Sequence, residues 1–383
     1  MINLGFWKEM TPVALGRPCF VLAPMADVTD AAFRHIINKY GKPDVLWTEF
    51  VSADGLIRAT PEGKMKLMRD LLFEKGEDGI GGEHPIVAQL FSSKPEYMRQ
   101  AAKLCADLGF DGVDINMGCP DRGIEKQGCG AAMIKNPKLA REIIRAAKEG
   151  VAESVLRKDG SKGAAIPVSV KTRIGYNKNE LATWLPELLA EEPALITIHC
   201  RTRKEMSDVP ARWEHVAEAI AIRNEIQKEA IVNGKPFTLI FGNGDATSLD
   251  DAHLKATSSG AEGVMLGRAI FGNPWLFHSL QMDKKADSSL LSNQASKNHN
   301  IRYNVYCPYE PSVEEKLRVL VEHTKKFMEL LGDIKNFAIM KKHYKAYVNG
   351  FDGAKELRVE LMEAENVDEI EKLVDTFLNT HKA

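Results

Sequence analysis

Short apolar runs recur through the first two thirds of the chain, and a stretch with helical periodicity follows each of them. Eight such runs occur, at residues 19–24, 45–50, 85–91, 112–117, 166–172, 194–200, 237–244 and 261–267. Several are apolar almost throughout, which is typical of strands buried on both faces. Eight strand-then-helix units predict an α/β fold with a closed parallel (β/α)8 TIM barrel. An open doubly wound sheet is the alternative, but no GxGxxG fingerprint follows the first run.

The segments between the runs and after them predict helices. Residues 93–109 and 136–150 are amphipathic, and the second of these begins at Asn-Pro and ends at a glycine, which indicates a helix start and stop. Residues 281–311 are rich in Ser, Asn, Asp and Lys and are expected to form a linker or surface excursion. Residues 312–383 predict a small bundle of about four helices, so we expect a barrel domain over 1–280 and a helical domain over 312–383.

Composition adds a few limits. With 383 residues, 44% of them hydrophobic, the chain can fill one large core and a small one. Its formal net charge of −2 is not that of a strongly basic protein, so any contact with nucleic acid must come from a local patch. The six cysteines have neither zinc-site nor disulfide-scaffold spacing, which suits a reducing compartment and predicts no metal. The first 18 residues contain no signal peptide or membrane span, and we expect a cytoplasmic, monomeric protein away from membranes.

Candidate functional residues fall where these predicted strands end. Reactive groups of a βα barrel lie at the carboxyl ends of its strands, so the polar groups there should converge on one mouth. They are Pro24, Met25, Ala26, Gln89, Asn116, Cys119, Lys171, Arg173, His199, Arg201, Arg203, Asn243, Gly244, Asp245, Gly267 and Arg268. Each alone has an ordinary structural explanation, whereas their joint placement indicates a site.

Two glycine-containing loops predict a phosphate site. Barrels often bind phosphate with the loops after strands seven and eight, where glycines expose backbone N–H groups. Residues 242–244 and 267–268 fit that position, and Arg268 adds positive charge. Either loop alone could be an ordinary strand-to-helix turn.

Lys171, His199 and Cys119 are the candidates for chemistry. A lysine at this strand end could stabilise negative charge that develops on a bound molecule, and His199 would lie one strand away. Cys119 lies between a glycine and a proline just past a strand end. A thiol with a pKa of roughly 8.5 is mostly protonated at neutral pH and can give up a proton. It could instead be a nucleophile with His199 as its base. Cys129 and Cys200 are interpreted as structural.

Several long motifs, in one order, resemble those of the tRNA dihydrouridine synthases. They are APMADVTDAAFR (23–34), DINMGCPDRGIEKQGCGAAMIKNP (114–137), VSVKTRIGYN (168–177), HCRTRKE (199–205), FGNGD (241–245), GVMLGRAIFGNPW (263–275) and KKHYKAYVNGFDGAKELR (341–358). The similarity extends from the first predicted strand to the third C-terminal helix. Long motifs in a shared order are far more specific than any short pattern.

The resemblance implies an FMN-dependent oxidoreductase that reduces the C5–C6 double bond of uridines in tRNA, with NADPH as the reductant. By similarity, FMN would contact Pro24, Met25, Ala26, Gln89, Lys171 and His199, and its phosphate Asn243, Gly244, Asp245, Gly267 and Arg268. Cys119 would protonate C5 of the uracil, and Asn116 and Arg173 would hold the base. The target uridine must leave its stack, which favours loops of the RNA over helices.

The C-terminal domain is where contact with tRNA is expected. Over 335–349 the residues Phe337, Met340, Tyr344 and Tyr347 form one stripe at helical spacing, which indicates core packing. The rest of that helix carries Lys335, Lys341, Lys342, His343 and Lys345. By itself this is a solvated face, but with the resemblance Lys341, Lys342 and Lys345 are expected to contact phosphates, with Arg201 and Arg203 as further candidates.

Two other functions stay open. A second kind of FMN-barrel oxidoreductase, similar to dihydroorotate dehydrogenase, would share the phosphate loops and the lysine but would not need a basic helical domain. A tRNA-binding chaperone would not need the flavin chemistry. The intact sequence at 116–120 and Lys171 argue against a chaperone that has lost its activity.

Overall fold

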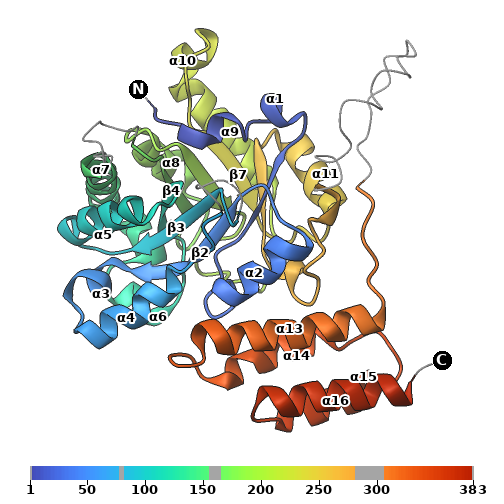
Figure 1. The fold of residues 1–383 in the computed structure, drawn as a ribbon. Helices are drawn as coiled ribbons and strands as arrows, with labels where there is room; N and C mark the ends of the chain where they lie inside the picture. The colour runs from blue at the N-terminus through green and yellow to red at the C-terminus, as the bar shows by residue number, and fades with distance from the viewer. Residues whose placement is uncertain (1, 77–81, 155–164, 281–305, 382–383) are drawn as a thin grey trace, which may run out of the picture. The chain divides into compact units, whose positions relative to one another are not determined.

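The first part of the chain forms a parallel barrel in the computed structural model, which describes residues 2–76, 82–154, 165–280 and 306–381. One eight-stranded parallel sheet has the order β1-β8-β7-β6-β5-β4-β3-β2. Figure 1 shows strands of this sheet with helices around them. Its strands are β1 (Cys19–Leu22), β2 (Leu46–Ser52), β3 (Ile86–Phe91), β4 (Gly112–Met117), β5 (Val168–Arg173), β6 (Leu195–His199), β7 (Leu239–Asn243) and β8 (Gly263–Leu266). All eight predicted strands are therefore confirmed.

The barrel closes between the first two strands. β1 pairs with β8, with Cys19 opposite Gly263, so the last strand returns beside the first. On its other side, Leu22 donates its N–H to the carbonyl of Val45 at 3.2 Å, and Val21 forms a parallel bridge with Val45. Closure leaves no free sheet edge, and it confirms the predicted (β/α)8 barrel rather than an open doubly wound sheet.

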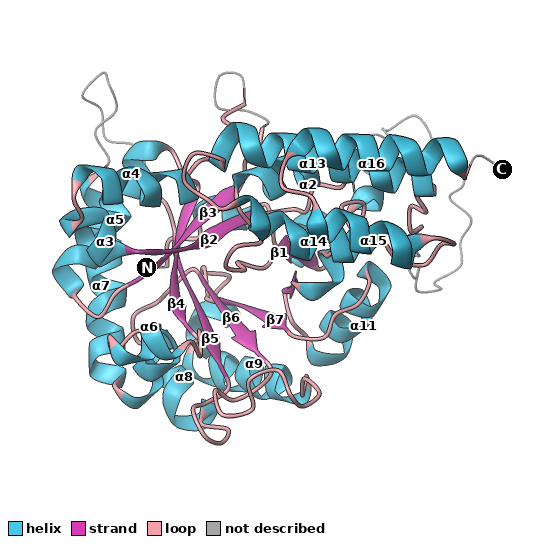
Figure 2. Ribbon diagram, turned by 90° about the horizontal axis from the view of Figure 1, so that it is seen from below, coloured by secondary structure: helices cyan, strands magenta, loops and turns pink. Residues whose placement is uncertain are grey.

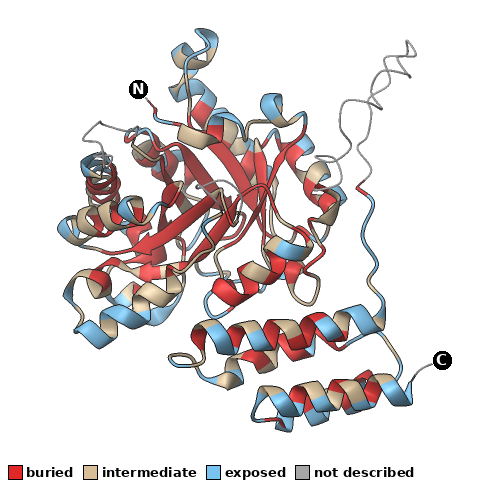
Figure 3. Ribbon diagram, viewed as in Figure 1, coloured by how far each residue is buried: buried red, intermediate tan, exposed pale blue. Residues whose placement is uncertain are grey.

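Alternate residues of each strand point into the barrel and fill its amino-terminal half with apolar side chains. Val21, Trp47, Val87 and Phe241 belong to one buried cluster there. The cluster also takes in Trp7 from the N-terminal segment, whose ring lies 5.6 Å from that of Phe241 in an edge-on arrangement. Figure 3 shows the strands as almost entirely buried. Polar side chains are thereby left for the carboxyl ends of the strands.

Helices surround the strands (Figure 2). The longer ones in this part of the chain are α3 (Ala53–Arg58), α4 (Pro61–Asp70), α5 (Pro95–Leu108), α7 (Pro137–Glu153), α8 (Leu181–Leu189), α9 (Glu214–Ile226) and α11 (Leu249–Ser259). Short helical turns are η1 (Gly5–Lys8), α1 (Pro12–Leu15), α6 (Arg122–Lys126), η3 (Gly130–Lys135) and α10 (Lys228–Val232). Burying the strands on both faces is what their near-continuous apolar sequences require.

The predicted stop of one helix is wrong. α7 begins as expected, with the Asn136 side chain accepting the N–H of Leu139, but it continues through Gly150 to Glu153. A Cβ at Gly150 would lie 2.0 Å from the carbonyl oxygen of Arg99 on α5. The glycine therefore permits close packing of two helices and does not end the helix.

The chain divides into two compact units. The first holds the barrel: residues 1–29, 44–247 and 251–267. The second takes in 30–43, 248–250 and 268–383, so helix α2 (Ala31–Tyr40) belongs to it. The predicted division of function between residues 1–280 and 312–383 stays a prediction, and most of the predicted linker lies outside the described residues.

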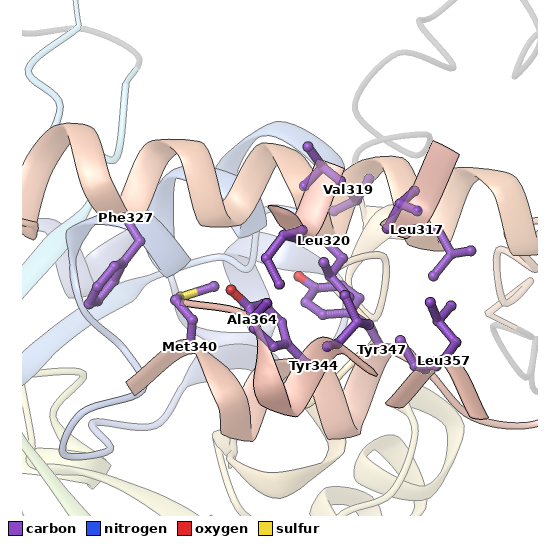
Figure 4. Packing of buried hydrophobic residues seen from close by; sticks show 14 of the residues in the cluster. Leu317, Val319, Leu320, Phe327, Met340, Tyr344, Tyr347, Leu357 and Ala364 are labelled. Atoms are coloured by element: carbon purple, nitrogen blue, oxygen red, sulfur yellow. The ribbon is translucent and has the colours of Figure 1, made fainter. Parts of the chain in front are cut away.

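The second unit confirms the expected helical bundle. Its helices are α2, η4 (Arg268–Ile270), α13 (Val313–Leu331), η5 (Phe337–Met340), α14 (Lys341–Tyr347), α15 (Ala354–Glu363) and α16 (Val367–Thr380). α13 begins with a capping box, in which Ser312 and Glu315 each accept the other's backbone N–H. The core joins Leu320, Met340, Tyr344 and Leu357 from successive helices (Figure 4).

The segment 335–349 differs from its prediction in two ways. It is not one helix, because the 3-10 turn η5 precedes α14. The apolar stripe is confirmed, since Met340, Tyr344 and Tyr347 are buried and Phe337 packs against them. His343, however, does not lie on a basic face: it is only 1% exposed. Its ring is 5.4 Å from that of Phe33 on α2, so aromatic packing and not charge decides its place.

Two histidines meet in this core without hydrogen-bond partners. The rings of His323 and His343 lie 4.7 Å apart, and no described residue bonds to any of their four ring nitrogens. Burial lowers the pKa of His343 to about 3 and that of His323 well below its usual value. Both are therefore neutral in the folded unit, and charging either one would bury an uncompensated cation.

We predict that the helical unit loses stability as the pH falls from 6.5 towards 3. The unfolded chain takes up a proton at each histidine near pH 6.5, whereas the folded unit does not, so each costs about 2 kcal/mol at pH 5. His343→Phe should remove about half of this loss between pH 7 and pH 5, as measured by thermal unfolding followed by circular dichroism. His381→Phe is the control, because that side chain is already exposed. An unchanged pH dependence in His343→Phe would contradict the assignment.

Candidate active site

The turn after β1 contacts the end of β8. In this turn the N–H of Met25 is accepted by the Thr29 hydroxyl at 2.9 Å. A Cβ added to Gly267, just after β8, would lie 3.6 Å from the Met25 sulfur and 3.6 Å from the Ala23 Cβ. Pro24 and Met25 are half-buried and Ala26 is exposed. Three predicted cofactor residues and Gly267 thus share one part of the barrel mouth.

Three interior polar side chains on β3 and β4 are joined by hydrogen bonds. The Gln89 amide nitrogen donates to Asp114 Oδ2 at 2.7 Å, and the Gln89 carbonyl oxygen accepts from Asn116 Nδ2 at 3.2 Å. Burial raises the pKa of Asp114 to about 6, although Gln89, Ser169 and Lys171 favour the charged form. The carboxylate is therefore ionised at neutral pH.

The loop that carries Cys119 is held by contacts to its backbone. Asn116 Oδ1 accepts the N–H groups of Gly118 and Cys119 at 3.1 and 2.9 Å. The Cys119 carbonyl accepts the N–H of Ala131 at 2.9 Å. The thiol itself is half-buried, and desolvation raises the pKa of Cys119 above its ordinary value. A thiol in this environment stays protonated at neutral pH.

Lys171 lies opposite Asn116 in the pairing of β5 with β4. Removal from bulk water, and then the charge of Arg173, lower the pKa of Lys171 to about 8, while Asp114 acts in the opposite direction. The lysine therefore keeps its charge at neutral pH. No described residue accepts a hydrogen bond from its ammonium group, so the group is available to a bound molecule.

Arg173 connects two loops of the mouth. Its Nε donates to the Gly118 carbonyl at 2.8 Å, and Nη1 donates to the carbonyls of Thr202 and Met206 at 3.0 and 2.9 Å. Burial lowers the pKa of Arg173 to about 10, which leaves the guanidinium charged. It holds the loop after β4 against the loop after β6.

His199, Arg201 and Asp245 form one group at the ends of β6 and β7. Arg201 is 2% exposed and pairs with Asp245, and its Nη1 lies 3.4 Å from His199 Nε2. Asp245 has a positive φ of 52° and also accepts the N–H of Ala211. A Cβ at Gly244, where φ is 128°, would lie 2.9 Å from the Ala211 Cβ, so this loop requires glycine.

The two predicted phosphate loops leave backbone donors available. The Asn243 side chain already has a partner within the protein, because its amide nitrogen donates to the Met265 carbonyl at 2.8 Å. The N–H groups of Gly244 and Gly267 have no hydrogen-bond acceptor among the described residues. Arg268 is exposed and begins η4 in the second unit.

Among the remaining predicted contacts to RNA, Arg203 and Lys341 have protein partners. Arg203 pairs with Glu125 and lies over the Tyr176 ring at 5.5 Å. In the second unit, Lys341 donates to the Met362 carbonyl at 2.6 Å, and Lys345 is exposed. Lys342 is half-buried. The contact of Arg201, Arg203 and these lysines with RNA stays a prediction.

Asp114 was not identified from the sequence as a site residue. It lies in the middle of β4, where its neighbours Val113 and Ile115 are apolar and buried. A lone carboxylate inside such a strand was the available signal, because a buried charge requires partners.

The part of the chain that the structure describes holds neither a candidate metal site nor a candidate membrane span. In the stretches 2–76, 82–154, 165–280 and 306–381, no group of three or more His, Cys, Asp or Glu side chains could hold a metal ion. No helix within the same stretches is long and apolar enough to cross a membrane.

Comparison with known proteins gives similarities over nearly the whole chain. The family model described as dihydrouridine synthase matches residues 21–382. A probable tRNA-dihydrouridine synthase of Staphylococcus aureus is 36% identical over 375 residues, which is 97% of this chain and 95% of the relative. A probable tRNA-dihydrouridine synthase 2 of Bacillus subtilis strain 168 is also 36% identical, over 97% of this chain and 96% of the relative.

We predict that Cys119 reacts slowly with iodoacetamide at pH 8, because its raised pKa reduces the thiolate fraction roughly tenfold for each unit of increase. Its rate should still be rising above pH 9. Cys307 is an exposed thiol in the same chain and serves as the internal control. Both rates can be followed by peptide mass spectrometry. Faster alkylation at Cys119 than at Cys307 at pH 7 would indicate an activated thiolate instead of a proton donor.

Proposed function

Because the chain belongs to the dihydrouridine synthase family, we propose that it reduces the C5–C6 double bond of uridines in tRNA, using a noncovalent FMN that NADPH reduces. The observation that carries this proposal is the pair formed by Cys119 and Lys171. One is a thiol that stays protonated at neutral pH, and the other is a lysine that stays charged. The electrostatic effect of each on the other supports their closeness.

The donor set of the mouth fits a flavin mononucleotide. Lys171 offers an ammonium group without a hydrogen-bond acceptor in the described protein, which suits the negative edge of a reduced flavin ring. The N–H groups of Gly244 and Gly267 suit a phosphate, and Arg268 would add its charge. Asn243 and Asp245 would shape that phosphate site indirectly, since their side chains bond to Met265 and Arg201.

The other cofactor contacts would surround the ring. Met25, with its neighbours Pro24 and Ala26, would lie against one face of the flavin. Gln89 would donate with the amide hydrogen that Asp114 does not use, and His199 would approach from β6. When bound, reduced FMN would supply hydride to C6 of the uracil.

Cys119 would deliver the proton that completes the reduction. In the proposed step the thiol gives its proton to C5 while C6 receives hydride, so the double bond gains two hydrogens and the thiolate is reprotonated from solvent. The charges of Lys171 and Arg173 would stabilise that transient thiolate, because both lower the pKa of Cys119 while burial raises it. Asn116 and Arg173 would orient the base.

The helical unit would bind the tRNA. Lys345 is exposed on α14, and Lys341 and Lys342 precede it on the same helix. Arg201 and Arg203 would act at the barrel mouth mainly by ordering loops, since each already pairs with a carboxylate. The enzyme would act as a monomer in the cytoplasm, where its thiols stay reduced.

We predict that the purified protein binds one FMN and that Cys119→Ala retains it. The variant should still oxidise NADPH, because reduction of the flavin does not need the thiol. Dihydrouridine formation in tRNA, measured by nucleoside mass spectrometry, should fall by about 10²–10⁴-fold. Cys307→Ala is the matched control and should behave as wild type. If the wild-type protein reduces free pyrimidines but not tRNA, the proposal is wrong and the protein is an oxidoreductase that acts on a small molecule.

We predict that Lys342→Ala with Lys345→Ala weakens tRNA binding and flattens its salt dependence. The slope of log K against log salt should decrease by up to about 0.7–0.9 for each phosphate contact that is lost. Lys341 is left intact because it bonds to the Met362 carbonyl. Lys372→Ala is the control, because Lys372 is an exposed lysine on α16. NADPH oxidation without tRNA should not change in either variant. Parallel salt titrations with equal affinity would show that these lysines do not contact the tRNA.

A further inference from the structure

Asp114 lies at one end of a continuous hydrogen-bonded chain that ends at the Cys119 backbone. The Asp114 side chain is fully buried on β4, inside the barrel. Its Oδ1 accepts from the Ser169 hydroxyl at 2.6 Å, and its Oδ2 accepts from Gln89 Nε2 at 2.7 Å. An ionised carboxylate can only accept hydrogen bonds, so Gln89 must turn its NH2 group towards it.

This choice determines the orientation of the next amide. With its NH2 group on Asp114, Gln89 turns its carbonyl oxygen towards Asn116. Asn116 must then offer its own NH2 group, which leaves Asn116 Oδ1 to face the N–H groups of Gly118 and Cys119. Those two N–H groups are donors and demand an oxygen. Both ends of the chain therefore require the same orientation of both amides.

We propose that Asp114 is a positioning residue, which acts through the amides of Gln89 and Asn116 to fix the backbone at Gly118 and Cys119 and thereby the place of the thiol. The consequence for proton transfer rests on the proposed function of Cys119, whereas the ordering of the loop does not. Burial raises the pKa of Asp114 only to about 6, which keeps it an acceptor at neutral pH.

Removing the carboxylate would remove this constraint. Leucine has nearly the shape of aspartate but accepts no hydrogen bond, so Asp114→Leu leaves the Gln89 NH2 group without its acceptor. Gln89 is then no longer held with its carbonyl oxygen towards Asn116, and the hydrogen bonds from Gly118 and Cys119 to Asn116 Oδ1 weaken.

The test is hydrogen exchange, followed by mass spectrometry, in peptides that span residues 115–121 of the full chain. Asp114→Leu should accelerate exchange of the Gly118 and Cys119 amides by about fivefold or more, the effect of losing one net hydrogen bond. Gln89→Leu interrupts the hydrogen-bonded chain at its middle and should accelerate the same exchange. It is the second test in case the first variant folds poorly. Ser169→Ala is the matched control: it removes the other donor to Asp114 and leaves the amides in place, so exchange there should not change.

Three results would overturn the proposal: wild-type exchange in both Asp114→Leu and Gln89→Leu, an equal rise in Ser169→Ala, or an equal rise in peptides from β6 and β7. The last would indicate general loss of barrel stability. Cys119 alkylation should also change in Asp114→Leu but not in Ser169→Ala. If wild type makes no dihydrouridine, the proposed function fails, and the exchange data still decide the role of Asp114.

Discussion

Closure of the parallel barrel is the constraint on which the rest of the first unit depends. Once β1 pairs with β8 and Leu22 bonds to Val45, every second residue of each strand must point into a shared interior. Apolar side chains such as Trp47 and Phe241 fill one end of that interior. The polar side chains near the other end then face one another, and they need hydrogen-bond partners because little water reaches them.

The site satisfies this need with groups that serve each other. Asp114 accepts from Gln89, Asn116 holds the Cys119 loop, and Arg173 joins that loop to the one after β6. A buried polar group that loses its partner destabilises the fold, so a substitution at one member of the network weakens the hydrogen bonds of the next. The groups that still have a hydrogen atom to donate, Lys171 above all, are the ones available to a ligand.

The helical unit is stabilised in a different way. Its core is aromatic and aliphatic, and it includes two histidines whose ring nitrogens have no partner among the residues that the structure describes. Neutral imidazoles pack there much as phenyl rings would, against Phe33 and Phe271. Their lowered pKa values predict a sensitivity to acid whose cause is separate from the barrel's chemistry.

The sequence alone determined the eight strands and most helices, because strands buried on both faces are apolar throughout and amphipathic helices have a regular period. It also determined which strand ends carry polar residues, and the order of long motifs determined the family. Only the tertiary structure decided how those residues are used. Gly150 allows α5 and α7 to pack closely, His343 is buried against Phe33, and Arg201 pairs with Asp245. Each depends on a neighbour far away in the chain, which local patterns cannot specify. Asp114 is the clearest case: its proposed role follows from hydrogen bonds to Gln89 and Ser169, which lie 25 and 55 residues away along the chain and come beside it only when β3 and β5 pair with β4.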